Sequence, residues 1–235
     1  MASIGNAVMY PTENDDWMKT VLIGGILSFF GFLFVPILVV SGYIIRVIRH
    51  SLDGESKPPT FGEWEELLVD GVKAFVIGFV YLLVPGLVGA LTVGGSALAM
   101  ATGSRSGAAL GTAGFAFGML LTLVLSLAFG YVAVAAIVNF ASEGRFGAAF
   151  DFTSIKTVVF SSEYAIAWGL SIVVFFAASI VVGMLNAIPL LGTIAGAFVF
   201  FYAQVVAGHL WAGGYNDARD GSELTGRSDV GKSPV

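Results

Sequence analysis

The sequence predicts an all-α, polytopic membrane protein with about five membrane-spanning helices, and two observations lead to this fold class. Residues 20–45 contain no charged side chain, and three comparable or longer uncharged stretches follow. Because about 20 apolar helical residues cross the roughly 30 Å hydrocarbon core of a bilayer, each stretch is long enough to span it. The composition agrees, since the chain is 57% hydrophobic and 11% charged, whereas soluble domains carry about 25% charged residues. One membrane domain, with no separate soluble domain, is therefore expected.

The uncharged stretches and their polar borders predict the domain organisation. We expect an extracellular polar N-terminus at 1–19, a transmembrane domain at 20–212 and a disordered cytoplasmic tail at 213–235, because the tail is rich in Gly, Ser and Asp. The spans are expected at about 20–45, 74–101, 113–141, 164–187 and 190–212. A cleavable signal peptide is not expected, since residues 1–16 are polar and acidic.

The last two spans are predicted to form a tight helical hairpin. Pro189 follows Asn186-Ala187-Ile188, and proline disfavours helix at the residue before it. The alternative is one long kinked helix, but about 48 apolar residues would overshoot a bilayer.

The basic residues predict the orientation of the chain. With five spans, nine of them fall on one side: Arg46, Arg49, Lys57, Lys73, Arg145, Lys156, Arg219, Arg227 and Lys232. Lys19 and Arg105 fall on the other side. Since cytoplasmic loops carry an excess of lysine and arginine, we expect a plasma-membrane protein with its N-terminus outside and its C-terminus in the cytoplasm.

The first cytoplasmic loop is predicted to contain a short interfacial helix at 58–70. Thr60 and Glu63 have the spacing of a capping box. Phe61, Trp64 and Leu68 would then form one apolar stripe along the helix. Such an amphipathic helix is expected to lie in the plane of the membrane interface.

The second cytoplasmic loop shows a weaker version of the same pattern. Asp151 is a candidate N-cap, and Phe152, Ile155 and Val159 follow at matching spacing. The two loops together could be a platform for a partner or a lipid headgroup. The alternative is a structural role in sealing the inner rim of the bundle.

Two arginines beside the first loop are candidates for the same interface. Arg46 and Arg49 lie about one helical turn apart just after the first uncharged stretch. Anchoring by snorkelling toward the headgroups is the commonest explanation of such arginines.

Small residues at four-residue spacing predict close packing of the spans. The glycines concerned are Gly103, Gly107, Gly111, Gly114, Gly118, Gly192 and Gly196. Residues four apart share one helical face, so neighbouring backbones can approach closely there. Packing within one chain is the default expectation, and packing between subunits is the alternative.

A small channel or carrier is the alternative function. Pro36, Pro85 and Pro189 could free backbone carbonyls, as the broken helices of transporters do. The polar side chains of such a cavity would be Asn139, Gln204 and His209. Against this interpretation, the middle of every expected span lacks the ionisable residue that ion-coupled carriers usually need.

Catalysis and cofactor binding are not expected. The chain has no cysteine and two histidines far apart, and none of the common catalytic or phosphate-binding motifs is present. We therefore expect no enzyme activity, no cofactor, no metal site and no nucleic-acid partner.

A family resemblance adds provenance to this interpretation. The chain has Arg46 and Arg49, then Asp53-Gly54, Pro58 or Pro59 with Phe61 and Trp64, and Asp70-Gly71-Val72-Lys73 before a span with Tyr81 and Pro85. This order resembles the archaeal membrane-protein family called domain of unknown function 4013, over nearly the whole chain. The resemblance implies several spans, amphipathic loops and an archaeal (haloarchaeal) plasma membrane, and it implies no specific activity.

The sequence thus favours a non-enzymatic membrane scaffold or assembly subunit that acts through its cytoplasmic loops. Membrane lipid is the expected partner, together with a membrane-protein partner or further copies of the chain.

Overall fold

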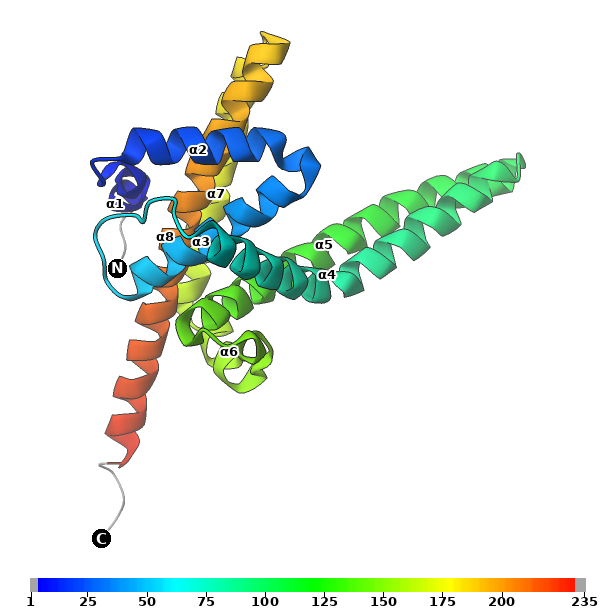
Figure 1. Ribbon diagram of the computed structural model, residues 1–235. Coiled ribbons are helices and arrows are strands. Elements are labelled where there is room, and N and C mark those ends of the chain that lie inside the picture. Colours follow the sequence, from blue (N-terminus) through cyan, green and yellow to red (C-terminus); the bar gives the residue numbers. More distant parts are fainter. Residues whose placement is uncertain (1–3, 231–235) are drawn as a thin grey trace. The chain divides into compact units, whose positions relative to one another are not determined.

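The computed structural model describes residues 4–230, without the side chains of residues 189 and 222–230, and every regular element in this part of the chain is a helix (Figure 1). The α-helices are α1 (Ile4–Met9), α2 (Trp17–Phe29), α3 (Val35–Leu52), α4 (Trp64–Ala101), α5 (Arg105–Glu143), α6 (Phe152–Val159), α7 (Ser162–Leu185) and α8 (Pro189–Val230). Three short 3-10 helices are η1 (Tyr10–Thr12), η2 (Phe30–Leu33) and η3 (Phe146–Phe150). The prediction of an all-α fold is confirmed.

By length and composition, five of these helices are candidates for crossing a membrane. They cover Val35–Leu52, Trp64–Ala101, Arg105–Glu143, Ser162–Leu185 and Leu190–Gly221, and a helix pair bent by 91° at the N-terminus is a sixth candidate. The number agrees with the predicted five spans. The protein is therefore a multi-pass membrane protein.

The chain divides into two compact units. The first contains Met1–Phe75 and Ala135–Val235, and the second contains Val76–Val134. Helices α4 and α5 each contribute to both units. Residues 64–75 of α4 and 135–143 of α5, which adjoin the two loops, belong to the first unit, and the rest of each helix belongs to the second.

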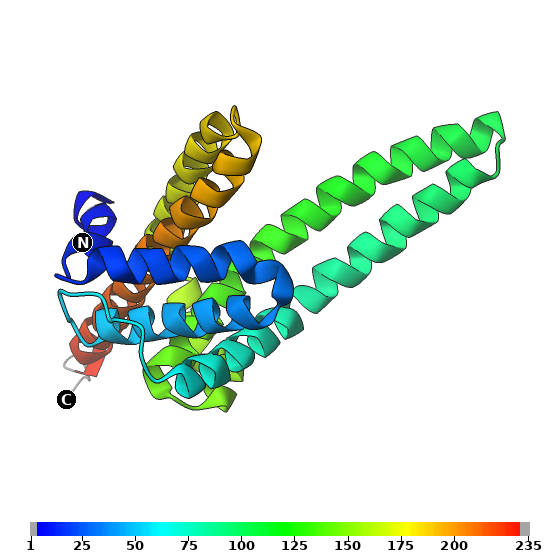
Figure 2. The ribbon, with the colours of Figure 1, turned by 45° about the horizontal axis from the view of Figure 1, so that its top comes forward.

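The predicted first span at 20–45 is not one helix. Helix α2 ends at Phe29, and η2 and Phe34 separate it from α3. Phe34 has φ +68°, which no residue inside a right-handed helix adopts. Both ribbon views show the chain reversing between α2 and α3 (Figures 1 and 2). The absence of charge established that this stretch is apolar, but it could not reveal the reversal.

The second unit is an antiparallel hairpin of α4 and α5, joined by a turn at residues 102–104 (Figure 2). A Cβ atom built at Gly111 would lie 2.7 Å from the Ser96 carbonyl oxygen, and one at Gly118 would lie 2.6 Å from the Thr92 side chain. These glycines therefore let the two backbones approach closely. Gly111 and Gly118 lie seven residues apart, about two helical turns, and they serve packing within one chain, as predicted.

Helices α7 and α8 form the second long hairpin, joined by residues 186–188 as predicted. Helix α8 continues past residue 212, where the last span was expected to end, and reaches Val230. The expectation of a disordered tail from residue 213 is therefore wrong for residues 213–230, and residues 231–235 lie outside the described residues. The reason is that α8 presents Tyr215 and Ala218 to the core of the first unit, where they are 1% and 4% exposed.

The core of the first unit lies at the loop-side ends of its helices. Fully buried large side chains include Tyr43, Phe140, Tyr164, Phe201 and Tyr215. In contrast, Phe176, Met184 and Leu190, near the α7–α8 turn, are between 68% and 72% exposed. A soluble protein would not expose so many large apolar side chains together, whereas a lipid environment solvates them.

Candidate functional site

The candidate site is a charged surface at the loop-side ends of α3 and α4, which we call the charged rim. It consists of Arg46, Arg49, Glu63, Glu66, Asp70 and Lys73, all in the first unit. Arg46 and Arg49 lie in the last turns of α3. Glu66, Asp70 and Lys73 lie in the first turns of α4, and Glu63 immediately precedes that helix.

Arg46 is neutralised by the start of α4. Its Nη2 atom lies 3.0 Å from a Glu63 carboxylate oxygen and 3.8 Å from one of Glu66. Its Nη1 atom donates a hydrogen bond of 3.0 Å to the Gly62 carbonyl. The Arg46 side chain is 15% exposed, so it joins α3 to the loop in addition to any contact with headgroups.

Arg49 and Lys73 share one carboxylate. Arg49 donates a charge-assisted hydrogen bond to Asp70, and the Lys73 Nζ atom lies 3.6 Å from the other Asp70 oxygen. Both cations also lie over the Phe140 ring, at 5.7 Å and 5.9 Å from its centroid. Aromatic faces attract cations, so Phe140 of α5 adds to the stabilisation of this pair.

Three open depressions surround Arg49, with volumes of about 510, 430 and 390 Å³. Each has a carboxylate in its wall beside the arginine: Asp70 in the first, Glu143 in the second and Glu63 in the third. Because acidic groups accompany the cation in every case, these depressions are poorly suited to a free anion. Nor does the described part of the chain bring three or more His, Cys, Asp or Glu side chains into a metal-binding arrangement.

The structure corrects the predicted interfacial helix of the first loop. Thr60 is outside any helix, Glu63 has φ +51°, and helix begins at Trp64 as the first turn of α4. A capping box at Thr60 and Glu63 is therefore wrong, because Glu63 pairs with Arg46 instead. The pattern of residue types could not distinguish a separate short helix from the first turns of a long one.

The predicted apolar stripe of the same loop is divided between two environments. Phe61 stacks on Tyr43 at 4.2 Å between ring centroids and also lies near Phe201, so it belongs to the core. Leu68 is half-buried, and its neighbour Leu67 is 1% exposed. Trp64 stacks on Phe61 but remains 50% exposed.

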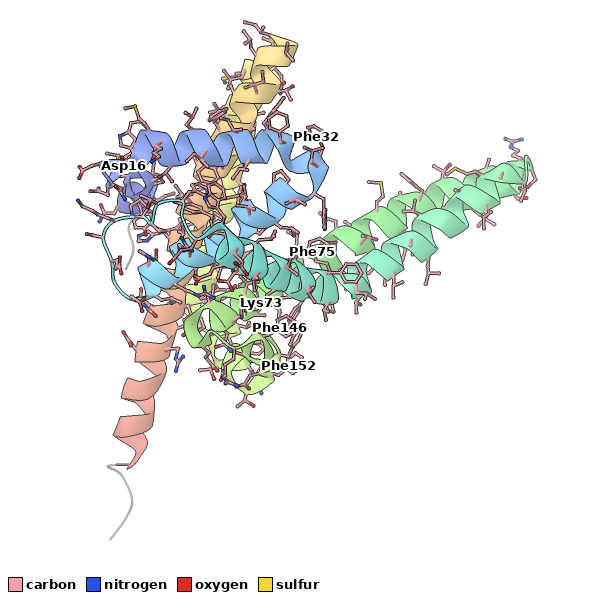
Figure 3. The ribbon with its side chains drawn as sticks, viewed as in Figure 1. Asp16, Phe32, Lys73, Phe75, Phe146 and Phe152 are labelled. Atoms are coloured by element: carbon pink, nitrogen blue, oxygen red, sulfur yellow. The ribbon has the colours of Figure 1, made fainter. Side chains whose placement is uncertain are left out.

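The second loop contains the predicted short helix, which is α6. The Asp151 side chain accepts hydrogen bonds from the backbone N–H groups of Thr153 and Ser154, so the predicted N-cap is confirmed. Hydrogen bonds, first from the Ser154 side chain, lower the pKa of the exposed Asp151 carboxyl. Ile155 is buried, whereas Phe152 is 66% exposed (Figure 3).

A buried polar network lies beneath the rim. Tyr215 donates a hydrogen bond of 2.5 Å to the Asn139 side chain, which donates in turn to the Ala148 carbonyl at 2.8 Å. Arg219 donates to the Tyr215 hydroxyl at 3.2 Å. Sequence reasoning missed Tyr215 because it lay in the supposed tail. The small and apolar residues at positions 210, 214 and 218 continue the helical spacing of α8 and were the available signal.

His209 is held by two other elements. Its ring stacks on Tyr10 of η1 at 4.0 Å between centroids, and its Nδ1 atom lies 2.9 Å from the Ser51 hydroxyl of α3. Burial raises the pKa of the Tyr10 hydroxyl. These contacts tie the N-terminal segment, α3 and α8 together.

The remaining residues of the proposed carrier cavity stand in unrelated settings. Gln204 donates to the carbonyl of Phe200 in its own helix, at 3.3 Å. Pro36 and Pro189 stand at the starts of α3 and α8, where no intrahelical hydrogen bond is lost. Pro85 lies inside α4, in the second unit. Two of the three prolines therefore free no helical carbonyl.

Comparisons with known proteins identify a family for this chain. The model of a family described as "Protein of unknown function (DUF4013)" matches residues 25–187, which is more than half of the chain. No curated protein matches the chain significantly, and neither does any solved structure.

Proposed function

We propose that this chain, which belongs to the DUF4013 family of proteins of unknown function, is a non-catalytic scaffold or assembly subunit of the plasma membrane. Its charged rim and C-terminus face the cytoplasm in this proposal, since cytoplasmic loops are enriched in basic residues. The sequence pI near 4.9 supports an origin in an archaeon with a high-salt cytoplasm.

The observation that carries the proposal is a set of aromatic side chains left exposed on the loop side. Trp64, at the start of α4, is 50% exposed. In the second loop, Phe152 and Phe160 are 66% and 80% exposed, although Ile155 and Val158 of that loop are buried. Aromatic anchors with one free face are typical of the centres of protein interfaces. We call Trp64, Phe152 and Phe160 the aromatic anchors.

The charge balance of the rim supports a structural role over a catalytic one. Arg46 faces Glu66 of α4 and Arg49 faces Asp70 of α4, each at ion-pair distance. Catalytic groups usually depend on an unbalanced or strongly perturbed charge. Balanced pairs of this kind instead fix the register of two helices.

A membrane-protein partner or a second copy of the chain is the expected occupant of the aromatic anchors, with lipid headgroups around them. Lys156 lies between Phe152 and Phe160 along the chain and is exposed, so the partner should present an apolar surface with an acidic border. The carrier alternative has less support, because Asn139 and His209 already have protein partners.

The test is a double variant, Trp64→Ser with Phe152→Ser, examined by native mass spectrometry of protein released gently from its own membrane. We expect a defined oligomer or a stoichiometric partner for the unchanged protein and loss of that species for the variant. Phe61 is left unchanged because it belongs to the core.

The matched control is Leu110→Ser, which removes a side chain that is 71% exposed beside the 102–104 turn. It should keep the assembly. If the double variant kept its partners, or if the unchanged protein proved monomeric, the proposal would fail.

A further inference from the structure

The first apolar segment of the chain has its two polar ends at one place. Asn14, before α2, donates a hydrogen bond of 2.9 Å to the Pro58 carbonyl, in the loop after α3. Asp15 lies 3.8 Å from the Lys57 ammonium group. Groups in direct contact cannot lie on opposite sides of a bilayer whose hydrocarbon core is about 30 Å thick. The expectation that the N-terminus and this loop face opposite sides is therefore incompatible with these contacts.

Contacts with α8 hold the N-terminal segment in the same place. Tyr10 stacks on His209, and the Tyr202 hydroxyl donates to the Val8 carbonyl at 2.5 Å. His209 also contacts Ser51, two residues before Asp53 at the C-terminal end of α3. The N-terminus, the first loop and this part of α8 thus form one packed region.

The uncharged parts of the two helices between these ends are each too short to cross a bilayer. The uncharged part of α2 covers residues 20–29, and that of α3 covers residues 35–45. At 1.5 Å per residue these parts are about 15 Å and 17 Å long, roughly half of the hydrocarbon thickness.

The turn between α2 and α3 is suited to hydrocarbon. Phe32, Leu33 and Phe34 are 76%, 57% and 50% exposed, and no charged residue lies near them in sequence. The turn keeps its backbone hydrogen bonds, since the Phe34 N–H donates to Gly31 at 2.9 Å. Backbone in a bilayer must satisfy its own polar groups, and the Phe34 carbonyl likewise accepts a hydrogen bond of 3.3 Å from the Leu38 N–H.

The strained residue of the turn is held by a contact of its own. Phe34 has φ +68° and packs edge-on against Phe75 of α4, with 5.2 Å between ring centroids. In Figure 3, Asp16 marks the polar end of α2, and Phe32 points away from the ribbon at the opposite end.

We infer that α2, η2 and α3 form a half-membrane hairpin, which enters and leaves the bilayer on the side of the charged rim and places its apolar turn among the acyl chains of one leaflet. Only α4, α5, α7 and α8 then cross the membrane, and both termini face the side of the charged rim. This inference does not depend on the proposed scaffold function. The basic residues agree with it, since Lys19 joins the other loop residues and leaves Arg105 alone on the opposite side.

The test uses single cysteines, because the chain has none of its own. Glu13→Cys reports the N-terminal segment, Ser56→Cys the first loop and Ser106→Cys the 102–104 turn; all three positions are exposed. A membrane-impermeant maleimide is applied to intact cells and to inverted vesicles. Glu13→Cys should be labelled from the same side as Ser56→Cys, and Ser106→Cys from the other side.

Labelling of Glu13→Cys from the side of Ser106→Cys, or from both sides, would overturn the inference. If the Glu13→Cys thiol were labelled from neither side, the pair Asp15→Cys with Lys57→Cys decides. A short bis-maleimide that joins the two supports the hairpin, and failure to join them overturns it.

The position of the turn has a test of its own. A nitroxide spin label on Phe32→Cys should be relaxed strongly by oxygen, which concentrates in acyl chains, and weakly by a water-soluble nickel complex. Strong relaxation by the nickel complex would place the turn in water and would refute its insertion.

Discussion

Replacing Gly71 with alanine is expected to separate α3 from α4. A Cβ atom at Gly71 would lie 1.7 Å from the Leu38 carbonyl oxygen, and one at Gly42 would lie 1.8 Å from the Leu67 carbonyl oxygen. The two glycines thus let the backbones of α3 and α4 touch. No side chain can rotate away to make room, because the obstructing atoms are backbone atoms.

The size of the effect follows from these distances. Ordinary van der Waals contact begins near 3.4 Å, so the two backbones must separate by about 1.7 Å around Gly71. Such overpacking costs about 1–3 kcal/mol of unfolding free energy. The separation would also strain the ion pairs that Arg49 and Arg46 make with Asp70 and Glu66 of α4.

The matched control is Gly78→Ala, about two helical turns further along α4. A Cβ atom there would meet nothing within 4 Å, so this change should be neutral or stabilising by up to about 1 kcal/mol, the helix preference of alanine over glycine. The assay is thermal unfolding in detergent, followed by circular dichroism. Equal melting temperatures for the two variants would refute the argument from close backbone contact.

Two further predictions concern single side chains of the first unit. Tyr215→Phe should lower the unfolding free energy by about 1–3 kcal/mol, because the Asn139 oxygen loses its donor in a buried site; unchanged unfolding in detergent would argue against this network. The lowered pKa of Asp151 means that its cap stabilises α6 above the carboxyl's unfolded-state pKa and that this stabilisation is lost as pH falls through the folded pKa. The protection of the α6 amides against hydrogen exchange, corrected for the intrinsic exchange rate at each pH, should therefore fall at acid pH in the unchanged protein, and Asp151→Ala should remove that dependence; identical protection at every pH for the two would contradict the cap's role.

Local chemistry fixed the parts of this protein that depend on composition and short spacing. The lack of charge along the long stretches predicted the helices, since a bilayer excludes ionised groups and unpaired backbone alike. Pro189 predicted the α7–α8 turn, and Asp151 predicted the start of α6, because both act within a few residues of themselves. The glycines of α5 predicted a close helix contact, and the structure supplied α4 as its partner.

Contacts between distant residues decided the rest. The reversal at Phe34 lies within an uncharged stretch, so no charged residue marks it. The hydrogen bond from Asn14 to Pro58 joins residues that a count of spans had put on opposite sides. Helix α8 runs beyond residue 212 because Tyr215 finds Asn139, 76 residues earlier in the chain. The sequence by itself determined which segments are apolar and helical, because those properties are local. Only the tertiary structure decided which of them reverse and what covers their ends, because a buried polar group is stabilised by whichever distant partner folding brings to it.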